Sequence, residues 1–148
     1  MKLSITKAKQ LKPKPDETQL GFGTKFTDHM FNMDYSPDQG WHHPRVEPYA
    51  PIALDPATMV LHYGQGVFEG LKAYRTAAGR IQLFRPLDNF RRLNRSNDIL
   101  CIPRFDENLP LDGLRELLKV EQDWVPRAPD TSLYIRPTIF ASDPFLGV

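Results

Sequence analysis

Proline is the residue that most limits what this chain can form. Fourteen prolines occur among 148 residues, about twice the usual share of ~5%, and seven of them precede residue 57. Each proline lacks an amide hydrogen and restricts the residue before it. The stretch up to Pro56, with prolines at 44, 48, 51 and 56, can therefore hardly be regular helix. We expect an extended, loop-rich front section.

The composition indicates one packed domain, because 41% of the residues are hydrophobic and 25% are charged. The net charge is +1, but five lysines precede the first acid, Asp16, and the remainder carries 14 basic against 18 acidic residues. This balance argues against nucleic acid as a partner. No apolar run approaches the ~18 residues of a membrane span, and no signal peptide is visible. We expect an unexported, cytoplasmic protein that does not bind membranes.

Metal and disulfide sites find little support in the sequence. Cys101 is the single cysteine, which excludes an intrachain disulfide and a structural zinc site built on thiolates. The four histidines show no spacing that fixes a metal geometry, and we favour solvated or packing roles for them. We therefore predict no metal site.

The hydrophobic patterns predict the elements in order. Residues 1–20 form a flexible segment, residues 22–35 a strand, and residues 71–75 and 80–84 a hairpin. One helix begins at Pro86 and ends before Pro103, and a second spans about 111–124 with Asp112 in its first turn. Residues 131–140 form a strand that lies at an edge or bends at Pro137. The order predicts an α+β fold, with an antiparallel sheet and flanking helices over residues 21–140.

A glycine-rich stretch, Gly64-Gln65-Gly66-Val67-Phe68-Glu69-Gly70, resembles a dinucleotide fingerprint only superficially. Its spacing is one residue too long, and it runs into a predicted strand instead of a helix. A turn that brings the backbone close to a ligand remains an alternative.

Two groups of cationic and aromatic residues are candidate anion sites. Arg91, Arg92 and Arg95 share a helix surface and suit a phosphate, although spacing alone favours a solvated stripe neutralised by Asp88 and Asp98. Tyr134 and Arg136 lie two apart in a strand and suit a carboxylate. An arginine stacked on a tyrosine is an equally good interpretation of that pair.

Several strings resemble the branched-chain amino acid aminotransferases, which are pyridoxal-phosphate enzymes of fold type IV. The strings are FGTKFTDHM, GWHHPRVEPY, LHYGQGVFEGLKAY, LFRPLDNFRRLNRS, DWVP and SLYIRPTIFASDPFLGV, in the family's order. The resemblance implies the smaller N-terminal domain, with residues 141–148 beginning the connection to a C-terminal catalytic domain that is absent here.

The resemblance also implies roles for individual residues. Arg92 matches the arginine that binds the phosphate of pyridoxal 5'-phosphate. Arg136 matches the arginine that recognises the distal carboxylate of glutamate. The aromatic residues that enclose the branched substrate side chain are matched by Phe22, Tyr63, Phe68 and Tyr134. Leu146 and Val148, like Tyr63, match residues that reach toward a partner subunit, so a homodimer is implied.

The catalytic lysine, which forms the Schiff base in this family, has no counterpart among the eight lysines. We therefore expect the full-length parent to transfer amino groups from leucine, isoleucine or valine to 2-oxoglutarate, and this chain alone to be inactive. Two alternatives remain: a relative acting on D-amino acids or aminodeoxychorismate, and a stand-alone module that binds a small anion.

Overall fold

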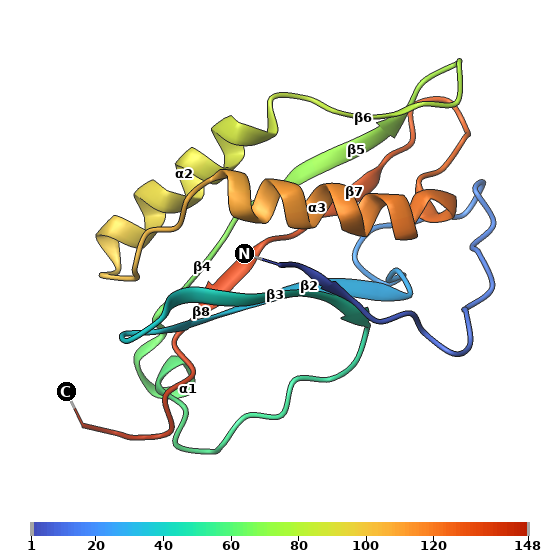
Figure 1. Ribbon diagram of the computed structural model, residues 1–148. Helices are drawn as coiled ribbons and strands as arrows, with labels where there is room; N and C mark the ends of the chain where they lie inside the picture. The colour runs from blue at the N-terminus through green and yellow to red at the C-terminus, as the bar shows by residue number, and fades with distance from the viewer. Residues whose placement is uncertain (1, 148) are drawn as a thin grey trace.

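The computed structural model describes residues 2–147 (Figure 1). The first half contains β1 (Ser4–Ile5), β2 (His29–Ser36), β3 (Gly40–Pro48), α1 (Met59–Tyr63), β4 (Gly66–Phe68) and β5 (Leu71–Arg75). The second half contains β6 (Ile81–Leu83), α2 (Pro86–Ile99), α3 (Asn108–Val120), a 3-10 turn (Gln122–Trp124), β7 (Leu133–Ile135) and β8 (Thr138–Phe140). Among these residues, no helix has the length and apolar character needed to cross a bilayer.

The α+β class is confirmed, but the strands divide among three small sheets instead of one. Their orders are β1-β3-β2, β4-β8 and β6-β5-β7. All pairs are antiparallel except β1 with β3, which run parallel. The proline-rich stretch before Pro56 is partly regular, because β3 extends through Pro44 and ends at Pro48.

Helix α3 lies between the β6-β5-β7 sheet and the sheet that contains β2 and β3 (Figure 1). Its Leu111, Leu114 and Leu118 join the main core with residues of α2 and β5. The opposite side of α3 approaches β2 at Gly113, where a Cβ would stand 2.7 Å from Phe31 Cδ2. Glycine at this position therefore allows the helix to pack closely on the strand.

The hairpin of β5 and β6 and the start of α2 at Pro86 follow the sequence expectations. Two expected elements have different bounds. The strand expected over 22–35 is regular only from His29, since residues 21–28 form bends and loop. The helix expected over about 111–124 is α3, which begins at Asn108 and ends at Val120, so Asp112 lies beyond its first turn. The bend expected at Pro137 is confirmed, and the two halves of residues 131–140, β7 and β8, pair with different sheets.

The N-terminal segment makes defined contacts that local sequence patterns did not indicate. Strand β1 pairs with β3, and the Ala8 amide donates to His29 Nε2 at 2.7 Å. The Lys12 amide and Lys14 Nζ each donate to Asp28 at 2.8 Å. In Figure 1 this blue segment passes the C-terminal end of α3.

Candidate functional site

The strand that runs through β4 and β5 separates two sets of side chains. From Val67 to Tyr74, buried and more exposed residues alternate without interruption. Val67, Glu69, Leu71 and Ala73 point inward, whereas Phe68, Lys72 and Tyr74 are exposed. Because successive side chains on a strand point to opposite faces, Phe68 and Glu69 belong to different surfaces.

The outer surface carries an aromatic cluster that we define as Phe22, Phe68, Tyr134 and Arg136. The rings of Phe22 and Tyr134 meet edge to face with centroids 5.0 Å apart. The Arg136 guanidinium lies 4.3 Å from the Phe68 ring centroid and 5.2 Å from that of Tyr134. Arg136 Nε donates to Tyr134 Oη at 3.1 Å. Phe22 is 70% exposed and Phe68 is 64% exposed, so the cluster presents apolar rings around one cation.

Gly70 lies directly beneath this cluster. A Cβ at Gly70 would stand 3.0 Å from Tyr134 Cζ and closer still to its phenolic oxygen. Because real Cβ atoms do not approach other atoms so closely, the glycine is required for the position of the tyrosine. The close approach that the structure shows at this glycine-rich stretch is to a tyrosine of the protein itself.

The inner surface carries an ion pair between Glu69 of β4–β5 and Arg92 of α2. Arg92 Nε donates to Glu69 Oε1 at 2.7 Å, and Arg92 Nη2 donates to Glu69 Oε2 at 2.6 Å. Asn89 Nδ2 donates both to Glu69 Oε2 at 2.7 Å and to the Gly70 carbonyl at 3.1 Å. The pair is therefore bidentate, and it is fixed to the strand by Asn89.

Burial acts to raise the pKa of Glu69, but the hydrogen bonds from Arg92 and Asn89 and the charge of Arg92 outweigh it, so the pKa lies below its ordinary value. The hydrogen bonds to Glu69 and the charge of that carboxylate raise the pKa of Arg92. Both groups are therefore charged at neutral pH. Although Glu69 is buried, the Arg92 side chain is 57% exposed and can meet another anion.

Arg92 and the aromatic cluster thus lie on opposite sides of one strand. Arg92 bonds to Glu69, and Asn89 donates both to Glu69 and to the Gly70 carbonyl, while Tyr134 lies against the other side of Gly70. Tyr63 and Leu146 form a separate contact, since Tyr63 Oη donates to the Leu146 carbonyl at 2.5 Å. Val148 lies outside the described residues.

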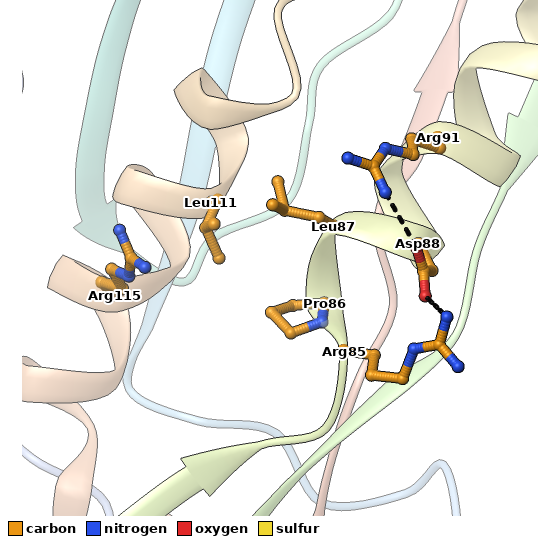
Figure 2. Close-up of a pocket in the computed structure, with 7 residues that line it drawn as sticks. All are labelled: Arg85, Pro86, Leu87, Asp88, Arg91, Leu111 and Arg115. Atoms are coloured by element: carbon orange, nitrogen blue, oxygen red, sulfur yellow. Dashed lines mark hydrogen bonds and ion pairs between the residues drawn. The ribbon is translucent and has the colours of Figure 1, made fainter.

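Arg91 of α2 and Arg85, which directly precedes the helix, share a different acidic partner. Arg91 and Arg85 both pair with Asp88, at 3.0 and 2.6 Å, and Figure 2 shows the two side chains converging on that carboxylate. They border an open cavity of about 450 Å³ that does not include the aromatic cluster. Asp98 pairs with Arg104 and not with the arginines of α2.

The histidines occupy separate positions. His29 is buried against Glu121, His43 pairs with Asp34, and His62 contacts the Pro56 carbonyl. Among residues 2–147, no three metal-ligating side chains gather in one place.

Reasoning from the sequence missed Glu69, Asn89 and Gly70 as parts of this site. A signal for Glu69 was present, because it interrupts an otherwise apolar inward series, and a buried carboxylate requires a cationic partner.

Relatives of the chain share its sequence over its whole length. It is 57% identical over 148 residues to branched-chain-amino-acid aminotransferase 2 of Bacillus subtilis, covering 100% of this chain and 40% of that protein. It is 58% identical over 137 residues to branched-chain-amino-acid transaminase 1 of the same species, covering 93% and 38%. A probable enzyme of this name from Staphylococcus epidermidis is 52% identical, covering 99% and 41%. No family model matches the chain.

Solved structures of the same group share the fold. The branched-chain aminotransferase of Thermoproteus uzoniensis with norvaline has a TM-score of 0.58 and 26% identity, covering 70% of this chain and 33% of that one. The Escherichia coli enzyme has a TM-score of 0.56 and 27% identity, covering 69% and 32%. Another branched-chain aminotransferase, complexed with N-(5'-phosphopyridoxyl)-L-glutamate, has a TM-score of 0.51 and 29% identity, covering 64% and 30%. The chain belongs to the branched-chain amino acid aminotransferase family, and it spans about two fifths of the length of the curated relatives it matches.

Proposed function

We propose that the full-length protein containing this chain transfers the amino group of leucine, isoleucine or valine to 2-oxoglutarate with pyridoxal 5'-phosphate, as a cytoplasmic homodimer. In this proposal the chain supplies the substrate walls and one contact to the cofactor phosphate. The proposal rests on the identity with branched-chain aminotransferases and on the geometry of the aromatic cluster.

The observation that carries the proposal is the position of Arg136 between two aromatic rings, 4.3 Å from the Phe68 centroid and 5.2 Å from the Tyr134 centroid. A transaminase of this kind must accept an aliphatic side chain in one half-reaction and an acidic one in the other. The exposed rings can bury an aliphatic side chain, which is favourable by about 25 cal/mol per Å². The guanidinium at their edge can bind the distal carboxylate of glutamate.

Arg92 fits the phosphate of the cofactor. Guanidinium has five N–H donors, and Glu69 occupies Nε and one position on Nη2, which leaves further donors on a side chain that is more than half exposed. Glu69 holds the fork in one orientation, so little side-chain entropy is lost when an anion binds. Pyridoxal phosphate, when bound, supplies the electron sink for the reaction.

This chain holds the walls of the site but, in our proposal, not the lysine that the chemistry requires. Lys72 is a lysine beside the cluster, because it lies opposite Tyr134 in the pairing of β5 with β7. We expect no stable adduct when pyridoxal phosphate is added to residues 1–148, reduced with borohydride and examined by mass spectrometry. An adduct on Lys72 would overturn the assignment of catalysis to a part outside this chain.

The role of Arg136 is tested by Arg136→Ala in the full-length protein. The loss of a charge-assisted hydrogen bond to a carboxylate is worth about ten- to hundredfold in rate. We expect kcat/KM for glutamate to fall by about that factor more than kcat/KM for leucine. Arg115→Ala, which removes a surface arginine paired with Asp112, serves as the matched control. Equal losses for both substrates in the Arg136 variant would contradict the proposal.

A further inference from the structure

The loop that carries Phe22 is fixed to the domain at both ends, and the Phe22 ring at its tip packs against Tyr134. Phe22 stands between Gly21 and Gly23, whose φ values of 65° and 75° are accessible mainly to glycine. At the far end of the loop, Asp28 is buried and accepts hydrogen bonds from Lys14 Nζ at 2.8 Å and Trp124 Nε1 at 2.7 Å. The chain after Phe22 is therefore tied to the body of the domain.

Glu17 connects the chain before Phe22 to the segment that precedes β7. Its carboxylate accepts the Arg127 amide at 3.0 Å on Oε1 and 2.9 Å on Oε2, and it accepts the Ala128 amide at 2.6 Å on Oε2. Arg127 and Ala128 belong to the segment that leads into β7 and Tyr134. One carboxylate thus joins the two segments that carry the touching rings of Phe22 and Tyr134.

Further hydrogen bonds connect the residues next to Glu17 with the rest of the loop. Asp16 Oδ1 accepts the Thr18 amide at 2.9 Å and the Thr18 hydroxyl at 2.7 Å, and Lys25 Nζ donates to the Gln19 carbonyl. The base of the loop is therefore closed on itself by its own hydrogen bonds. The loop borders an open hollow of about 500 Å³ lined by residues that include Lys14, Thr24, Phe26 and Trp124. This open space leaves the loop room to shift if the Glu17 contacts are lost.

We propose that Glu17 is a positioning residue that sets the packing of Phe22 against Tyr134, and thereby the discrimination between long and short aliphatic substrates. This inference rests on the proposed function, because it assigns Phe22 and Tyr134 to the substrate wall. Glu17 acts through Phe22 and touches no substrate. Its contacts are to backbone amides, so they do not depend on the side chains at 127 and 128.

The test replaces Glu17 by Gln in the full-length protein. Both carboxylate oxygens accept amide hydrogens, so a Gln side chain would direct its NH2 group at one of these donors. We expect the ratio of kcat/KM for leucine to kcat/KM for alanine to fall about three- to tenfold, because part of an apolar wall is lost. The matched control is Glu116→Gln, which removes a carboxylate paired with Lys119 on the exposed side of α3. We expect no change in the ratio for this control.

A double-mutant cycle with Phe22→Ala separates positioning from general destabilisation. If Glu17 acts through Phe22, adding Glu17→Gln to Phe22→Ala leaves the leucine-to-alanine ratio of Phe22→Ala unchanged. If the two substitutions lower the leucine-to-alanine ratio independently, so that their factors multiply in the double variant, the inference is overturned. Glu17→Asp, which keeps the charge but is one methylene shorter, provides a second variant and should lower the ratio in the same way.

Hydrogen exchange gives a readout that does not depend on catalysis. The amides of Arg127 and Ala128 should exchange about tenfold faster in Glu17→Gln than in the wild type, because their acceptor is lost. Unchanged exchange would show that the Glu17 contacts do not form. Faster exchange with an unaltered substrate ratio would show that they form without positioning Phe22. A wild-type protein that does not transaminate leucine would instead contradict the proposed function, and exchange would still report on Glu17.

Discussion

The phenolic oxygen of Tyr134 occupies the space that a side chain on Gly70 would need. A Cβ at that position would lie 3.0 Å from Tyr134 Cζ and closer to Oη. Tyr134 also accepts a hydrogen bond from Arg136 Nε and contacts the ring of Phe22. Gly70 therefore governs the position of three members of the aromatic cluster.

Gly70→Ala should impair activity more than stability. The obstructed atoms are the outer end of a side chain, so Tyr134 can move aside at a cost of about 1–2 kcal/mol. The displaced tyrosine would no longer hold Arg136 and Phe22. We expect leucine transamination to fall at least about tenfold, measured alongside urea unfolding. Gly66→Ala in the same strand is the control, because its Cβ would meet its nearest atom at an ordinary 3.4 Å. Equal activity in the two variants would contradict this role for Gly70.

Arg92→Lys should weaken cofactor binding although the charge is kept. Lysine is a point charge and cannot make the two parallel bonds to Glu69 that orient the guanidinium. We expect the dissociation constant for pyridoxal phosphate to rise about tenfold or more in the full-length protein, as measured by equilibrium dialysis. Arg91→Lys, one residue earlier and paired with Asp88 on the surface, should change it less than about twofold. Similar effects in both variants would remove the special role of Arg92.

Asp28 should make stability depend on acid pH. Burial acts to raise the pKa of Asp28, but hydrogen bonds from Lys14, the Lys12 amide and Trp124 outweigh it and lower the pKa to about 2. A carboxyl group with a depressed pKa in the folded state stabilises the protein above its unfolded pKa of about 4, and this contribution is lost as pH falls toward about 2.

The contribution of Asp28 corresponds to about 2 kcal/mol at neutral pH. We expect the difference in unfolding free energy between wild type and Asp28→Asn to shrink by this amount between pH 7 and pH 2, measured by urea unfolding. Asp112→Asn, which alters an exposed pair with Arg115, should show a nearly constant difference. A constant difference for Asp28→Asn would exclude the ionised, bonded carboxylate.

Much of the fold follows from local patterns in the sequence. The alternation through residues 71–75 and 80–84, with a glycine in the turn, predicts the hairpin that the structure forms with β5 and β6. Pro86 at a first helical position, followed by a helical stripe of apolar residues, predicts α2. Each of these signals lies within a single element, because the spacing of its apolar residues shows whether the element is a helix or a strand and which side of it is buried.

The sequence by itself thus determined the hairpin of β5 and β6, the two long helices α2 and α3, and, through long shared strings, the family. Only the tertiary structure decided the partners: Glu69 with Arg92, Phe22 with Tyr134, and Glu17 with the amides before β7. It also decided that residues 131–140 divide between two sheets at Pro137. The periodicity of a sequence shows which side of an element is buried, but it does not show which residue will lie against that side. Contacts between distant segments depend on how the whole chain packs around its core.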